Sequence, residues 1–210
     1  HTREDNSKDR NNDTGILSKY RIESDIKLIS YDIDEDIGSV TKITCNVKGM
    51  TVCVYSIHLD WHNYIPYYEI GFDGSPDKKG KYNRLPKGRP SNEVIKELSG
   101  NSKRLSQIQR IIEDANMEIS RNNLVILGGD FNEAITTPEK PYNQVYRTLR
   151  ENGFVDAYSE KWETTPEIGY TINTNYSFHG IPTPDRIDFI FYRVPPVMQV
   201  VNERTHLIGP

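Results

Sequence analysis

The sequence lacks any apolar run long enough to span a membrane, and it has no internal repeat and no low-complexity tract. It also lacks a positive charge balance. The formal net charge is −4, which argues against a protein that grips nucleic acid mainly through a basic surface, although a local basic patch could still serve. Its hydrophobic share is low at 35%, as expected for a globular chain with a polar surface.

Cysteine is scarce as well. The only two cysteines, Cys45 and Cys53, lie on the two runs that flank Lys48-Gly49. A hairpin about that pair would bring them near each other, but the loop length decides whether they face directly. The favoured interpretation is two buried small side chains in a sheet, and a bonded pair stays open. The cysteines therefore do not decide the cellular compartment.

With 210 residues, the chain is long enough for one good core and short for two domains. Its most informative stretch is Leu124–Glu133, in which four large aliphatic residues stop at a Gly-Gly pair. A short apolar run bounded by turn signals predicts a strand buried on both faces. Asp130 and Asn132 follow at its carboxyl end, where ligands bind in open α/β folds. The alternative is that Gly129–Asn132 is simply a tight turn.

Two further stretches have the same form. The run Val52–Asp60 ends in a histidine and a carboxylate, and Arg186–Tyr192 carries an acid near its start. The motifs Ser56–Leu59, Gly129–Asn132 and Arg186–Phe191, in this order, resemble the endonuclease/exonuclease/phosphatase superfamily. This superfamily of metal-dependent phosphoesterases includes pancreatic deoxyribonuclease, apurinic endonucleases, neutral sphingomyelinases and inositol-polyphosphate phosphatases.

The resemblance implies a single domain over 1–210, with a two-sheet β-sandwich flanked by helices. Periodicity alone predicts only a mixed α/β fold. It also implies hydrolysis of a phosphodiester or phosphomonoester with a divalent cation, Mg²⁺ or else Mn²⁺ or Ca²⁺. The substrate class stays open among small-molecule, lipid-derived and nucleic-acid phosphoesters, because the family's branches share these residues and differ in the surrounding loops.

The resemblance assigns a role to each motif. Asp130 would activate the water, Asn132 would donate to a phosphate oxygen, and both would serve as oxygen ligands of the metal ion. His58 would contact the phosphate or the leaving oxygen. Asp188 would hold a partner imidazole in its useful tautomer. The alternatives are a core histidine at His58, and at Asp188 a salt bridge to Arg186 or a strand-end cap.

The residues 60–102 predict a long insertion loop that leaves directly from the His58 motif. Its basic half includes Lys78, Lys79 and Lys81, which we expect to approach an anionic substrate. The alternative is a solvated charge run. His179 lies in a stretch that resembles a Thr-(Phe/Tyr)-His-Gly segment of bacterial members, which makes it a candidate substrate contact.

The remaining elements follow from periodicity and turn signals. We expect residues 1–14 to be loosely attached. The predicted strands are 26–31, 39–47, 50–59 and 197–201, and the segment 15–20 resembles a strand of the superfamily. The predicted helices cover about 102–120, without obvious chemistry of its own, and a segment from near Pro141 to Gly153.

The sequence departs from the superfamily at both ends. No residues before Leu17 match the metal-binding Asn and Glu motifs, and no Ser-Asp-His follows at the end. We therefore expect these residues to be part of a longer protein. The second candidate function is a catalytically inactive module that binds a phosphorylated ligand or a protein partner. The resemblance to exported bacterial members favours a periplasmic or extracellular location, which the residues themselves do not decide.

Overall fold

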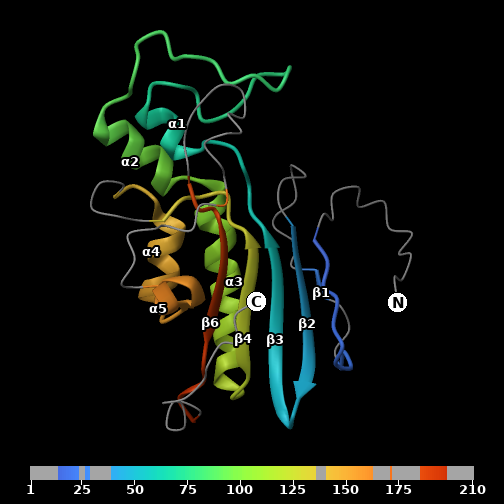
Figure 1. The fold of residues 1–210 in the computed structure, drawn as a ribbon. Coiled ribbons are helices and arrows are strands. Elements are labelled where there is room, and N and C mark those ends of the chain that lie inside the picture. The colour runs from blue at the N-terminus through green and yellow to red at the C-terminus, as the bar shows by residue number, and fades with distance from the viewer. Residues whose placement is uncertain are drawn as a thin grey trace.

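The computed structural model describes residues 14–23, 27–28, 39–135, 141–162, 171 and 185–197. They form a six-stranded mixed sheet with the strand order β1-β2-β3-β4-β6-β5 (Figure 1). Its strands are β1 (Lys27–Leu28), β2 (Ser39–Val47), β3 (Met50–His58), β4 (Leu124–Asp130), β5 (Val155–Asp156) and β6 (Asp188–Arg193). Its helices are α1 (Ile65–Glu69), α2 (Asn92–Gly100), α3 (Lys103–Ser120), α4 (Gln144–Glu151) and α5 (Ala157–Trp162).

The helices α3 and α4 pack on one face of this sheet, and the main core lies between them and the strands (Figure 1). This confirms the mixed α/β class. The expected two-sheet sandwich is not seen in full, because the described residues form a single sheet. On the face away from α3, Ile190 is 59% exposed, so the part of the chain described here leaves that side of β6 uncovered.

The central strand β4 is half-buried, and the prediction of a strand buried on both faces is wrong. Val125 and Leu127 are fully buried and belong to the main core, whereas Leu124 and Ile126 are only partly buried. Successive side chains of a strand point to opposite faces. Among the described residues, helices cover one face of β4, and every second aliphatic residue of this strand stays in partial contact with solvent.

The predicted hairpin is confirmed, with β2 and β3 joined at Lys48-Gly49. Its register pairs Cys45 with Val52, and Cys53 with Thr44. The two cysteines are therefore one position out of step and lie on opposite faces of the sheet. Both are buried and free, as the favoured interpretation predicted.

The predicted helix over 102–120 is confirmed as α3. It begins where the Ser102 side chain accepts the N–H of Leu105, which satisfies one free donor of the first turn. The predicted segment from Pro141 contains α4, which begins later, at Gln144, and ends before Gly153. The segment after Gly153 forms β5 and then α5.

A buried ion cluster fixes α3 on the hairpin. Lys42 of β2 donates to Asp114 at 2.6 Å and to Glu118 at 2.7 Å, and both acids lie on α3. The Tyr55 hydroxyl of β3 donates to the same Asp114 carboxylate at 2.6 Å. Because buried charges are costly unless they are paired, this cluster specifies where the helix lies along the strands.

The stretch 60–102 is not a structureless loop, since it contains α1 and α2. Aromatic packing attaches it to the chain just before β6. Tyr64, Tyr67 and Ile187 form a buried cluster, and the Tyr64 hydroxyl donates to Asp185 at 2.8 Å. The predicted insertion is thus a folded wall that joins the exit of β3 to the entry of β6.

Two predicted strands fall partly outside the described residues, and a third is not formed. Of 26–31, only β1 is described, and of 197–201 only Val197, which lies in a 3₁₀ turn. The stretch 15–20 forms no strand, and its Leu17 is fully exposed. Residues 1–13 lie outside the described ranges. Across the described ranges, no helix has the length and apolar character needed to cross a bilayer.

Candidate functional site

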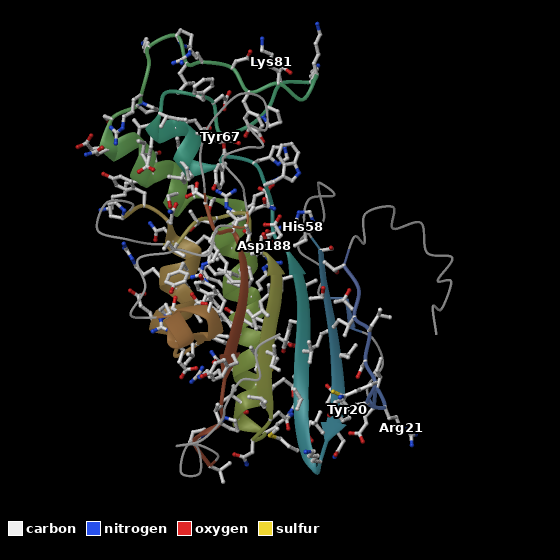
Figure 2. All side chains as sticks on the ribbon, in the orientation of Figure 1. Tyr20, Arg21, His58, Tyr67, Lys81 and Asp188 are labelled. Carbon is white, nitrogen blue, oxygen red and sulfur yellow. The ribbon has the colours of Figure 1, made fainter. Side chains whose placement is uncertain are left out.

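Three predicted site residues lie in one row across the sheet. His58 pairs with Asp130 in the parallel β3–β4 ladder, and Asp130 pairs with Asp188 in the antiparallel β4–β6 ladder. Paired residues point to the same face, and here it is the face away from α3, because their neighbours Ile57 and Phe189 lie in the main core. Figure 2 shows His58 and Asp188 at the same end of the sheet. The structure thus brings these three predicted residues together at one edge of the sheet.

Gly129 allows this row to form. Its φ is +139°, and a Cβ at this position would lie 1.9 Å from the carbonyl oxygen of Ile57. Only glycine tolerates so close an approach of the two backbones. The Gly-Gly pair lies within β4, which continues to Asp130, so the tight-turn interpretation is wrong and the strand delivers the carboxylate directly.

Beyond the strand ends, hydrogen bonds join the three rim segments. The N–H of Leu59 donates to the carbonyl of Asp130 at 3.0 Å, and that of Phe131 donates to Ile187 at 2.9 Å. The side-chain amide of Asn132 donates to the carbonyl of Leu59 at 2.8 Å. Asn132 has a φ of +49°, in the left-handed region that asparagine tolerates. These bonds hold the candidate residues in fixed relative positions.

Asp130 is the electrostatic centre of the row. Its carboxylate lies 4.0 Å from Nε2 of His58 and accepts the N–H of Asn132 at 2.7 Å. Its pKa is raised from 3.8 to about 6, chiefly by burial and also by the negative charge of Asp188; the Asn132 N–H and the charges of His58 and Arg104 oppose this. A carboxyl with a pKa near 6 is a suitable proton acceptor at neutral pH.

We expect Asp130→Asn to raise the free energy of unfolding at neutral pH by about 1–2 kcal/mol. Because folding raises this pKa, the native state binds the proton more tightly than the unfolded chain does. The wild-type stability therefore falls as the pH rises from 3.8 through about 6, whereas asparagine is neutral throughout. We take about half of the full effect of the shift, since water reaches 32% of the side chain.

Urea unfolding of both proteins at about pH 4 and about pH 7.5, with chelator present, checks this expectation. The two proteins should have similar stability at the lower pH and differ at the higher one. A gain of equal size at both pH values would contradict it, because the change would then not come from the charge of Asp130.

The core histidine at His58 and the salt bridge between Asp188 and Arg186 are not found. The His58 side chain is 32% exposed, so it is not a core histidine. Arg186 forms two hydrogen bonds with Asp156 and is buried with it, which leaves Asp188 free of the proposed salt bridge to Arg186. Asp188 is exposed, and its N–H donates to the hydroxyl of Thr171 at 3.2 Å.

The sequence analysis missed Arg104 and its buried partner Glu133. Arg104 is fully buried, and its guanidinium donates to Glu133 at 3.4 Å and to the carbonyls of Asp60, His62 and Asn63. These contacts connect the start of α3 to the segment after β3, which the sequence analysis did not foresee. A polar residue among the apolar positions of an amphipathic helix was the available signal, since an unpaired arginine is almost never buried.

The three predicted lysines lie away from the row of His58, Asp130 and Asp188. Lys78, Lys79 and Lys81 are exposed on a tight turn, in which the Asp77 carboxylate accepts the N–H groups of Lys79 and Lys81. Figure 2 shows Lys81 at the tip of the folded wall, beyond Tyr67 as seen from His58 and Asp188. His179 lies outside the described residues.

A metal ion would need more ligands than this row provides. Within the described ranges, no three His, Cys, Asp or Glu side chains cluster closely enough to hold one. Asp130 and Asn132 carry oxygen atoms of the kind that Mg²⁺ prefers, but the described residues do not make a complete set.

Neither a protein-family model nor a curated protein sequence matches this chain, but solved structures do. Truncated TDP2 from Caenorhabditis elegans aligns with a TM-score of 0.50 and 16% identity, over 85% of this chain and 55% of that one. TDP2 from D. rerio, complexed with a single-strand DNA product, gives a TM-score of 0.49 and 13% identity, over 83% and 54%.

An endonuclease/exonuclease/phosphatase family protein from Leptotrichia buccalis gives a TM-score of 0.40 and 16% identity, over 84% of this chain and 52% of that one. These are structural matches to members of the endonuclease/exonuclease/phosphatase superfamily at low sequence identity. The chain spans about half the length of the structures it matches. The likeness concerns the fold.

Proposed function

We propose that this chain carries catalytic residues of a phosphoesterase, at the sheet edge where His58, Asp130 and Asp188 lie. The proposal follows from a fold shared with the endonuclease/exonuclease/phosphatase superfamily. The observation that supports this most directly is the row of His58, Asp130 and Asp188, in which the pKa of Asp130 is raised to about 6. The complete two-sheet sandwich implied by the resemblance is part of the same proposal.

In this proposal, the Asp130 carboxylate accepts a proton from the water that attacks phosphorus. A pKa near neutrality keeps the carboxylate ionised at pH 7 and still basic enough for the transfer. His58 and the Asn132 amide contact the phosphate oxygens, where negative charge increases in the transition state. The negative charge of Asp188 maintains the basicity of Asp130.

The proposal includes a divalent ion, most naturally Mg²⁺, because of the shared fold. When bound, such an ion neutralises charge on the phosphate. Asp130 and Asn132 are the residues of this row with suitable oxygen atoms, and the described residues do not complete the site. The requirement for metal is therefore a matter for experiment.

The test is hydrolysis of bis-p-nitrophenyl phosphate, supercoiled plasmid, sphingomyelin and inositol phosphates by the full-length protein. Each substrate is assayed with Mg²⁺, Mn²⁺ or Ca²⁺ and with excess chelator. Turnover that chelator abolishes supports the metal-dependent hydrolase and selects its substrate class. No turnover by a folded, metal-supplied protein would overturn the proposal in favour of the inactive binding module.

We further propose that the lysine turn guides an anionic substrate. Replacing Lys78, Lys79 and Lys81 with serine should raise KM roughly fivefold at low salt and leave kcat unchanged, because exposed charges contribute little each and act at a distance. The difference should shrink as salt is added, since a Debye length falls to about 8 Å at 0.15 M. Steady-state kinetics across ionic strengths measures both effects.

The matched control removes three positive charges elsewhere, by serine at Lys19, Lys96 and Arg121, which are exposed. An equal rise in KM for this control would show that net charge alone is responsible. An unchanged KM for the lysine-turn variant would favour the solvated charge run.

A further inference from the structure

A second imidazole lies on the segment that leaves β3 beyond His58. His62 belongs to the segment between β3 and α1, and its Nδ1 is 2.7 Å from Oδ1 of Asp60. The same oxygen accepts the backbone N–H of His62 at 3.0 Å. The Asp60 side chain is 2% exposed, whereas that of His62 is 31% exposed. A buried carboxylate thus holds an imidazole that reaches solvent.

The bond to Asp60 fixes the tautomer of His62. Oδ1 already accepts the backbone N–H, so the ring nitrogen beside it is the donor, and the proton is assigned to Nδ1. The other nitrogen, Nε2, takes no part in this bond. A carboxylate behind an imidazole orients the ring and stabilises its protonated form.

Trp61 restricts the ring further. The indole and the His62 imidazole stack with their centroids 3.8 Å apart and their planes 23° from parallel. One face of the imidazole is therefore covered, and Nδ1 is bound to Asp60. These two contacts leave Nε2 as the ring nitrogen that is available to a substrate.

The backbone of this segment is attached to the Asp130 loop. The N–H of Leu59 donates to the carbonyl of Asp130, and the carbonyl of Leu59 accepts the side-chain amide of Asn132. One residue later, the N–H of Asp60 donates to the Gln107 side chain at 2.9 Å. The buried Arg104 donates to the carbonyls of Asp60 and His62 and to Glu133. His62 is thus fixed relative to the residues that follow β4.

We propose that His62 is the general acid of the reaction and that Asp60 is its positioning residue. This inference rests on the proposed function. The attacking water forms a bond to phosphorus and gives one proton to the Asp130 carboxylate. The bond from phosphorus to the leaving oxygen breaks, and that oxygen takes the proton from Nε2 of the His62 imidazolium. His58 stays in contact with the phosphate.

The test uses His62→Asn, because the asparagine amide can replace Nδ1–H as the donor to Asp60 but has no group at Nε2. It is assayed in the full-length protein on diphenyl phosphate and on bis-p-nitrophenyl phosphate. Phenolate needs a proton to leave, and p-nitrophenolate does not. We expect kcat to fall about 10²-fold on diphenyl phosphate and only slightly on the nitrophenyl ester.

Asp60→Asn is the second variant. It keeps Oδ1 as an acceptor and removes the negative charge beside Nδ1, so it should show the same ester dependence to a smaller degree. Equal losses on both esters, or none, with an unchanged Tm would overturn the inference and leave the proposed function standing. Absence of wild-type turnover on both esters and on every substrate of the panel above would overturn the proposed function and this inference with it.

Discussion

Asp130→Asn abolishes hydrolysis, on the proposed function, while the protein stays folded. The substitution keeps the shape of the side chain and the oxygen that accepts the Asn132 N–H at 2.7 Å. It removes the group with a pKa of about 6 that would accept the proton of the attacking water. Loss of a general base typically costs about 10²–10⁴-fold in rate, so we expect kcat to fall by at least that range.

The measurement is the turnover of the best substrate by wild type and variant, each with its Tm. Glu113→Gln is the matched control, because it replaces an exposed carboxylate on α3 with an amide and should not change turnover. An active Asp130→Asn protein would exclude Asp130 as the base. The row of His58, Asp130 and Asp188 would then have to act by binding alone.

Arg104→Met should reduce the free energy of unfolding by about 3–5 kcal/mol, because removing one partner of a buried ion pair leaves the other charge uncompensated. Arg104 is fully buried, and its removal also leaves three backbone carbonyls without their donor. Since a whole domain is typically stable by only about 5–15 kcal/mol, the loss should be plain in a urea unfolding curve.

Arg121→Met is the control, because its ion pair with Glu118 is solvent-exposed on the arginine side and should contribute less than about 1 kcal/mol. Adding Glu133→Gln to Arg104→Met should recover part of the loss, since it removes the stranded carboxylate. If Arg104→Met lowered the free energy of unfolding no more than Arg121→Met does, the buried pair of Arg104 and Glu133 would not be what holds these segments together.

The row of His58, Asp130 and Asp188 could be predicted from the sequence because each of these residues ends or begins an apolar run. His58, Asp130 and Asp188 are marked locally, and strands that lie side by side bring such ends together. Arg104 and Glu133, which support this row, show no comparable local sequence pattern. Arg104 meets Glu133 and the carbonyls of the Asp60 segment across long stretches of sequence. That pairing becomes visible only when α3 is placed on the sheet.

Burial was misjudged for a related reason. The run Leu124–Leu127 has the composition of a strand covered on both sides, yet its residues alternate between buried and partly buried. Composition reports which residues tolerate burial, and the neighbouring layers decide which ones are buried. The same limit applies to 60–102, where scattered aromatic residues suggested a loop and instead fix a folded wall through Tyr64, Tyr67 and Ile187.

The row across β3, β4 and β6 also bears on when the protein can become active during its synthesis. His58 and Asp130 meet once β4 joins β3, but Asp188 arrives only with the last described strand. Contacts between residues so far apart in sequence form late in folding. A nascent chain that has not yet reached residue 188 therefore holds an incomplete row, which under the proposed function would lack the charge of Asp188 beside Asp130.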